Sequence, residues 1–303
     1  MTSPTDTQTI PYVTNHARHD PGHCLAGIYR CLERGAKKPV IEPKEHDPSK
    51  KKKLYENLDV TYQFGDESMH FQCIGLLGVD DLRVNLGLVA LASDEKVTKC
   101  IKPESESRVG KALRGDMSLS GKVAGEDVIV VRFKFRQFLR EIGLAGSGFN
   151  ILRLKASIKR FASMLIEVRK GAEVCGFHML SYYFDDETEE MVVALNPRIS
   201  RAVFGGDGVR YAHISMSEVR ALKHDPSILI LFRLSAWVNK GATQRVGMDT
   251  LCGYCWPEEN QDLSVSAQKK RRLLVRRALQ ELENLGWGVE EIRSGQYRIT
   301  RPD

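Results

Sequence analysis

The stretch "QKKRRLLVRRALQELENLG", from Gln268 to Gly286, decides the fold because its apolar residues recur at the spacing of a helix. On a wheel of about 100° per residue, its apolar residues share one arc, which should face a core: Leu274, Val275, Ala278, Leu282 and Leu285. Polar residues occupy the opposite arc and its flanks: Lys269, Lys270, Arg272, Arg276, Arg277 and Gln280. We therefore expect one buried face and one exposed face.

The charges of this helix run against its dipole. Six cations lie in its first half: Lys269, Lys270, Arg271, Arg272, Arg276 and Arg277. Glu281 and Glu283 lie in the second half, although stability alone favours the opposite order by up to about 1 kcal/mol per exposed charge. Phosphate groups of a nucleic acid would compensate these cations. The alternative is a solvated basic face on a surface helix.

The residue types on the polar arc suit DNA bases. Arg and Gln side chains match the edges of guanine and adenine, and Leu273, inside the polar arc, could contact a thymine methyl group. The segment that follows, residues 287–302, alternates around Ser294–Gly295 and predicts a β-hairpin. Its polar residues would contact DNA as a wing does: Arg293, Tyr297, Arg298 and Arg301. The alternative is a two-stranded edge protected by charge.

The rest of the chain divides into a run of predicted elements. In the first half we expect a hairpin turning at Gly65–Asp66, a helix at 79–93, a strand leading into a helix at 126–143, a long helix at 149–171, and two strands joined by an acidic turn at 172–197. In the second half we expect helices at 215–225 and 226–241, an extended piece at 242–248, a short helix at 249–256, and a polar loop at 257–264. Pro226 suits a first helical position.

Each half thus runs through helix, strand, helix, loop, basic helix and hairpin, which is the order of a winged helix. The predicted fold is α+β with tandem winged-helix domains, two helix-turn-helix units each with a β-hairpin wing. We expect a partly flexible N-terminal arm at 1–57, with a solvated Lys50–Lys53 run, then domains at 58–197 and 198–303, the second being the main DNA reader. In the first unit the DNA contacts would be Asn150, Arg153, Lys155, Lys159 and Arg160, unless that helix is simply a core helix.

Composition limits the class of protein. The chain has 303 residues and a net charge of +6, which is modest, so the placement of its cations carries the argument. No apolar run is long enough to span a bilayer, and the N-terminus has no secretion signal. Seven cysteines, an odd number, do not suggest a disulfide framework. We expect a cytoplasmic protein without a membrane partner.

Three motifs could indicate a redox site, a metal site or a phosphate-binding loop, but none matches the sequence pattern that such a site needs. Cys252 and Cys255 have C-x-x-C spacing without a second ligand pair, so buried thiols explain them. His16, His19, His23 and Cys24 could bind a metal ion, but we interpret them as part of an ordered arm. Residues 115–123 depart from a phosphate-binding loop in glycine spacing. We expect no catalytic residue, no metal and no cofactor, and therefore a binding protein and not an enzyme.

Several stretches resemble the RepC-type replication initiators of IncQ-like plasmids. They are "RHDPGHCLAGIYRCLERG" (18–35), "EIG" (141–143), "MVVALNP" (191–197), "ISMSEVRAL" (214–222), "MDTLCGYCWP" (248–257) and "ALQELENLGWGVEEIRSGQYRITRP" (278–302). The resemblance implies an initiator that binds direct repeats, called iterons, in double-stranded plasmid origin DNA. It also implies opening of adjacent AT-rich DNA for a plasmid-encoded helicase and primase, and self-association is a further expectation.

Two DNA-binding roles compete at this point. If the protein is an initiator, Arg276→Ala should weaken the free energy of sequence-specific DNA binding by about 1–3 kcal/mol, and Arg301→Ala should weaken binding to DNA of any sequence. The alternative is a winged-helix transcriptional repressor acting on a plasmid operon, which would protect a symmetric operator without opening the strands.

Overall fold

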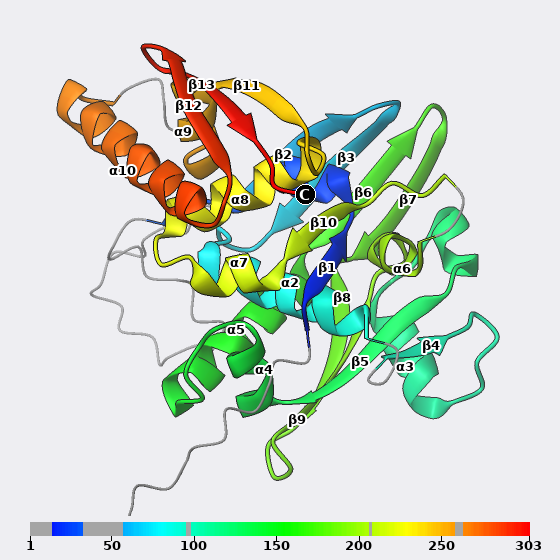
Figure 1. The fold of residues 1–303 in the computed structure, drawn as a ribbon. Helices are drawn as coiled ribbons and strands as arrows, with labels where there is room; N and C mark the ends of the chain where they lie inside the picture. The colour runs from blue at the N-terminus through cyan, green and yellow to red at the C-terminus, as the bar shows by residue number, and fades with distance from the viewer. Residues whose placement is uncertain (1–13, 33–56, 95–97, 206–207, 258–262) are drawn as a thin grey trace, which may run out of the picture.

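The computed structural model describes residues 14–32, 57–94, 98–205, 208–257 and 263–303 (Figure 1). The Lys50–Lys53 run, most of the expected arm and most of the 257–264 loop lie outside these residues. The fold is mixed α/β, and its sheets are antiparallel.

The first sheet has the order β2-β3-β6-β7 and is formed by β2 (Leu58–Phe64), β3 (Glu67–Cys73), β6 (Leu165–Lys170) and β7 (Glu173–His178). The predicted hairpin turn is confirmed at Gly65, whose φ of 62° favours glycine.

The second sheet has the order β4-β5-β9-β8, from β4 (Thr98–Ile101), β5 (Val128–Lys134), β8 (Leu180–Asp185) and β9 (Glu190–Leu195). The helices of this half are α2 (Val79–Ala92), α4 (Phe135–Glu141), α5 (Gly148–Ser163), α3 (Arg108–Asp116) and α6 (Pro197–Phe204), together with the 3-10 turn η1 (Gly121–Gly125).

The helix predicted at 79–93 and the strand–helix pair predicted at 126–143 are confirmed. Helix α2 is buried on most of its faces and packs against α5 and β5.

Two sequence predictions in this half are wrong. The helix predicted at 149–171 ends at Ser163, and its last part is β6, because Ile166 and Val168 alternate with polar residues and pair with β3. The segment 172–197 holds three strands instead of two, since β7 pairs with β6 while β8 and β9 form the acidic-turn hairpin.

The C-terminal part contains β10 (Ala212–Ser215), α7 (Met216–Ala221), α8 (Asp225–Trp237), β11 (Thr243–Gly247), α9 (Met248–Cys255), α10 (Val265–Asn284), β12 (Gly288–Arg293) and β13 (Gln296–Thr300). Pro226 lies in the first turn of α8 as predicted, and the terminal hairpin is confirmed. Helix α10 packs on α8 and α9, and the sheet has the order β11-β13-β12.

The two halves share one arrangement of strands and helices. Strand β5 runs directly into α4, a turn leads to the longer α5, and the hairpin β8–β9 then places β9 beside β5. Strand β11 runs directly into α9, a loop leads to the longer α10, and the hairpin β12–β13 places β13 beside β11. Strands β6 and β7 are an insertion between the long helix and the hairpin of the first half.

The segment 14–32, which the sequence assigned to the arm, is largely buried. Strand β1 (His16–His19) pairs with β10, and α1 (Pro21–Leu25) packs against α8 and β2 (Figure 1). One hydrophobic cluster extends from Ala17 to Ile299 through both halves. The domain boundaries inferred from the sequence stay a prediction.

The buried His19 and His23 and the half-buried His213 should make stability depend on pH. Burial is the main cause that lowers the pKa of His19, of His23 and of His213, the last from 6.5 to about 4. Below its unfolded-state pKa each histidine binds protons more readily in the unfolded chain, so stability should fall as pH drops from about 6.5 toward about 4.

We therefore expect the urea midpoint to be lower at about pH 5 than at about pH 7. The same measurement on His19→Gln should show a weaker dependence on pH. An unchanged midpoint across this range would contradict the prediction.

Candidate nucleic-acid interface

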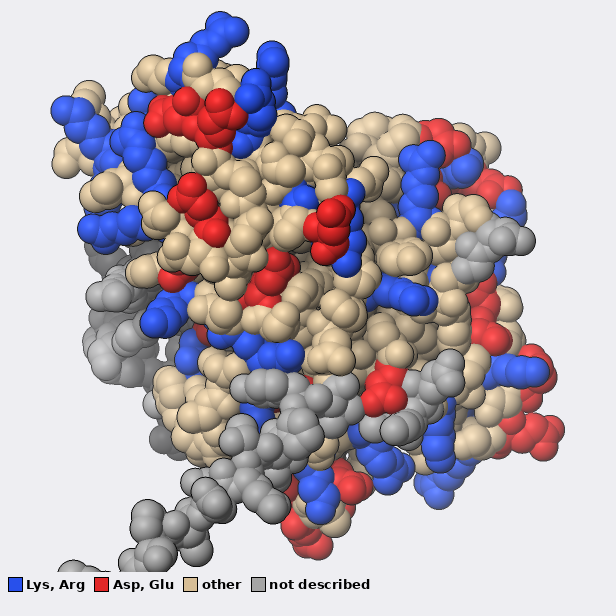
Figure 2. Space-filling model, viewed as in Figure 1, with Lys and Arg blue, Asp and Glu red and all other residues tan. Residues whose placement is uncertain are grey.

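Helix α10 has the two faces that its sequence predicts. Val275, Ala278 and Leu282 are fully buried and Leu274 and Leu285 are half-buried, while Leu279 joins the core as well. The opposite face is exposed and consists of Lys269, Lys270, Arg272, Leu273, Arg276, Arg277 and Gln280. Figure 2 shows Lys and Arg side chains gathered over α10 and around the β12–β13 hairpin. This face is the strongest candidate for a nucleic-acid contact.

The helix begins at Val265, so its cations start in the second turn, and Arg276 and Arg277 lie just past its middle and not in its first half as predicted. Ser264 caps the helix by accepting a hydrogen bond from the Ala267 amide at 3.2 Å. Helix α10 has no acidic residue in its first turn and no basic residue in its last turn. The partial positive charge of its N-terminus is therefore not compensated within the helix.

Most of the exposed cations lack a protein partner. Arg272 pairs with Asp249 of α9 at 2.9 Å, an exposed pair, and Gln280 donates to Glu283 at 2.8 Å. Within the described part of the chain no ion pair involves Lys269, Lys270, Arg276 or Arg277. Four cations thus remain available for an external anion.

Arg271 does not belong to this face. It is 9% exposed, and its guanidinium lies over the Trp256 ring, 4.9 Å from the centroid. We therefore assign it to the packing between α10 and α9 and not to a DNA contact.

Two of the four hairpin residues that are predicted to contact DNA are accessible to solvent. Arg293 is exposed, and Arg298 is half-exposed and pairs with Glu290 at 2.7 Å. Tyr297 is 4% exposed and packs in the core. Arg301 is 6% exposed and donates to the carbonyls of Ser235 (2.8 Å), Val238 (3.0 Å) and His213. It fixes the end of α8 to β10 and is not placed to contact phosphate.

Arg301→Ala should therefore reduce stability and not DNA affinity. Removing the guanidinium leaves buried carbonyls without a donor, which costs about 1–3 kcal/mol. Urea denaturation measures this loss, and Arg298→Ala is the control, since its exposed pair should contribute less than about 1 kcal/mol. A stable Arg301→Ala variant with weakened binding to all DNA would contradict the assignment.

The predicted contacts of the first unit are occupied within the protein. Arg153 pairs with Asp80, and Lys155 pairs with Asp186. Asn150 donates from Nδ2 to the Ala145 carbonyl at 2.8 Å, and Lys159 is half-buried. Arg160 is 1% exposed and pairs with Asp81, so we assign it to the core, where DNA cannot reach it. The most exposed large side chains of α5 are apolar, Phe149 and Leu152.

One exposed cation near the interface lies outside the predicted set. Arg245 of β11 is exposed and lies directly opposite Arg298 of β13. The alternation of "ATQRVGM" could have indicated it, because Arg245 and the buried Val246 fall on opposite faces of the strand.

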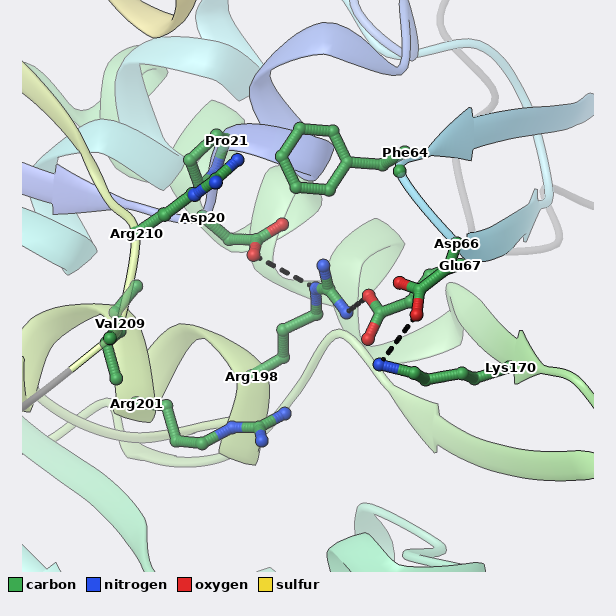
Figure 3. Close-up of a pocket in the computed structure, with 13 residues that line it drawn as sticks. Asp20, Pro21, Phe64, Asp66, Glu67, Lys170, Arg198, Arg201, Val209 and Arg210 are labelled. Atoms are coloured by element: carbon green, nitrogen blue, oxygen red, sulfur yellow. Dashed lines mark hydrogen bonds and ion pairs between the residues drawn. The ribbon is translucent and has the colours of Figure 1, made fainter.

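A pocket of about 510 Å³ lies elsewhere, between α1, the β2–β3 hairpin and α6 (Figure 3). At its centre Arg198 pairs with Asp20 at 3.0 Å and with Glu67 at 2.6 Å, and Lys170 pairs with Asp66 at 2.9 Å. Arg201 pairs with Glu126 at 3.2 Å, so three of the four cations that line the pocket are paired, and Arg210 alone has no ion pair with the described residues. It lacks the concentration of unpaired cations that α10 presents.

Most of the cysteines and histidines singled out in the sequence are buried, but His16 is exposed on β1. Cys252 and Cys255 are buried free thiols, and burial is the main cause that raises the pKa of each. His19 and His23 contact Asn85 of α2 instead. Among the described residues, no group of three or more His, Cys, Asp or Glu side chains is arranged to hold a metal ion.

Comparisons with known proteins identify the family of this chain. The model of a family described as "Replication protein C (RepC)" matches residues 12–303. No curated protein matches the chain. Two solved structures of RctB domains 2 and 3 are similar, each at 11% identity, with TM-scores of 0.45 and 0.47. They cover 83% and 82% of this chain, and 92% and 91% of their own chains. None of the described helices is long and apolar enough to cross a membrane.

Proposed function

We propose that this chain, which belongs to the replication protein C (RepC) family, initiates replication of a plasmid by binding origin DNA through the exposed face of α10. The observation that carries the proposal is the group of four unpaired cations on the exposed face of α10, for which DNA phosphates would supply the missing counter-charge.

The arrangement around α10 supports a winged-helix reading unit. Helix α9 and helix α10 would form the helix-turn-helix, and the β12–β13 hairpin would be the wing. Lys269, Arg272, Arg276 and Gln280 would face base edges, whereas Lys270 and Arg277 would hold phosphates. Arg293 and Arg298 would contact the backbone from the wing. The repeated order of β5, α4, α5 and the β8–β9 hairpin supports a second unit of the same kind.

The proposed mechanism uses binding energy and no covalent chemistry. Several copies would bind direct repeats in the origin and bend the duplex. The strain of this deformation would favour strand separation in an adjacent AT-rich segment. Opening of that segment would admit a plasmid-encoded helicase and primase. Such action requires contacts between copies, so we include self-association in the proposal.

One assay on a supercoiled origin plasmid tests this function. Footprinting should show protection of direct repeats, and permanganate should detect unpaired thymines beside them. Symmetric protection without opening would favour a repressor instead. A nicked or covalently attached strand would show that the protein is an enzyme.

A further inference from the structure

The turn between β8 and β9 is the most acidic stretch of the described chain. It reads "DDETEE" from Asp185 to Glu190 and occupies the place in the first unit that the β12–β13 turn occupies in the second. The β12–β13 turn carries Arg293 and no carboxylate between Ile292 and Gln296. An acidic wing would be repelled by DNA, so this turn must act on something else.

Its carboxylates bind the cations of the adjoining helix pair. Glu189 pairs with Arg136 in the first turn of α4 through both oxygens, at 3.1 Å from Nε and 3.3 Å from the second guanidinium nitrogen. Asp186 pairs with Lys155 of α5, and Glu190 pairs with Arg132 of β5 at 3.4 Å. Three successive elements thus have one cation each neutralised by the same turn.

The shape of the turn is fixed by hydrogen bonds. Asp185 accepts from the amides of Glu187 at 2.8 Å and Thr188 at 3.4 Å, which lowers the pKa of its carboxyl group. Glu189 has a φ of 54°, a left-handed conformation that few residues other than glycine adopt. Its carbonyl accepts from the Phe135 amide at 3.0 Å, which ties the turn to the start of α4. The carboxylates are therefore held over the cations.

Two of these ion pairs are exposed, and the third is exposed mainly at its acid. The side chains of Arg136 and Glu189 are 60% and 42% exposed, and those of Arg132 and Glu190 are 67% and 34% exposed. Asp186 is 66% exposed, whereas Lys155 is 18% exposed and lies over the Phe135 and Phe184 rings. Exposed pairs of this kind contribute little to stability and weaken with salt. Duplex phosphates can pair with the same cations, and the release of counterions from the DNA makes that binding more favourable. The arrangement can thus be displaced by DNA.

We propose that the β8–β9 turn is an intramolecular substitute for DNA phosphates, which keeps Arg132, Arg136 and Lys155 of the first unit from duplex DNA until it is displaced. The inference rests on the proposed function, since it concerns a second contact to the same origin DNA. It makes α10 the first contact and the first unit a restrained second contact.

The test compares two variants with the same change of charge. Asp186→Asn/Glu189→Gln removes two acids from the turn. Asp66→Asn/Glu173→Gln removes two acids from the β2–β3 and β6–β7 hairpins, where they pair with Lys170 and Lys122. Fluorescence anisotropy with a random-sequence duplex, over a range of salt concentrations, measures affinity and salt dependence.

The turn variant should bind about three- to tenfold more tightly, with a salt slope steeper by about 2, because Lys155 and Arg136 become available. The control variant should change by less than about twofold. Adding Arg136→Ala to the turn variant should remove about half of the extra slope. An equal gain in both double variants, or no gain in either, would overturn the inference.

The same titration separates this inference from the proposed function. Wild-type protein is also titrated with an origin-repeat duplex, which α10 alone should bind. Failure of wild-type protein to bind that duplex refutes the proposed function. If wild-type protein binds the repeat duplex but the turn variant gains no affinity for the random duplex, only the role of the turn is refuted. Unchanged circular dichroism shows that each variant is folded.

Discussion

Asp81→Ala should lower the free energy of unfolding by about 3–5 kcal/mol, because it leaves a buried arginine without its counterion. Asp81 is 0% exposed and pairs with Arg160, which is 1% exposed. The same carboxylate accepts hydrogen bonds from Ser157 Oγ at 2.5 Å and from the Gly78 amide at 2.8 Å. It therefore also provides an acceptor for a backbone amide at the N-terminus of α2. One side chain thus joins the N-terminus of α2 to the middle of α5.

Urea denaturation measures this loss, and the adjacent residue provides the control. Asp80 pairs with Arg153, and both side chains are partly exposed. Asp80→Ala should therefore cost no more than about 1 kcal/mol. Similar small losses in the two variants would show that the Asp81–Arg160 pair does not hold α2 against α5.

Arg276→Ala should have the largest effect of any single change on sequence-specific DNA binding. Arg276 lies at the middle of the exposed face of α10, and no ion pair with the described residues competes for it. A bidentate contact from arginine to guanine is worth about 1–3 kcal/mol of discrimination. Arg272 should have a smaller effect, because Asp249 already neutralises part of its charge.

The variant should keep its stability, since an exposed side chain without a protein partner contributes little to folding. Lys111→Ala is a matched control, because Lys111 is an exposed cation on α3 in the other half of the molecule. It carries the same change of charge and should leave specific binding unaltered.

The sequence predicts a helix or a hairpin well where the pattern of apolar and turn residues within that segment is sufficient to define it. The buried arc of α10, the helix at Pro226 and the hairpins at Gly65 and Gly295 all depend on short-range patterns, and the structure confirms them. Strand β6 depends instead on pairing with β3, far away in the sequence. A helical reading of "LIEVRK" is therefore reasonable until the partner strand is known.

Cations on a polar arc are harder to assign from the sequence. Arg160, Arg271 and Arg301 look like members of basic faces, yet each is buried against a partner from a distant segment. A long aliphatic stem allows arginine to enter a core when an acid, an aromatic ring or carbonyl groups receive its guanidinium. These partners cannot be read from helical spacing. The predicted site residues that stay exposed lie on one face of α10 and on the β12–β13 hairpin.

Reading of origin DNA by the exposed face of α10 is tested by measuring the affinities of wild-type protein, Arg276→Ala and Lys111→Ala. Each is measured with an origin-repeat duplex and a random duplex at one salt concentration. We expect wild-type protein to prefer the repeat duplex, Arg276→Ala to lose about 1–3 kcal/mol of this preference, and Lys111→Ala to keep it. Equal losses of affinity for the two duplexes in Arg276→Ala, or no loss for either, would show that Arg276 does not read the origin sequence.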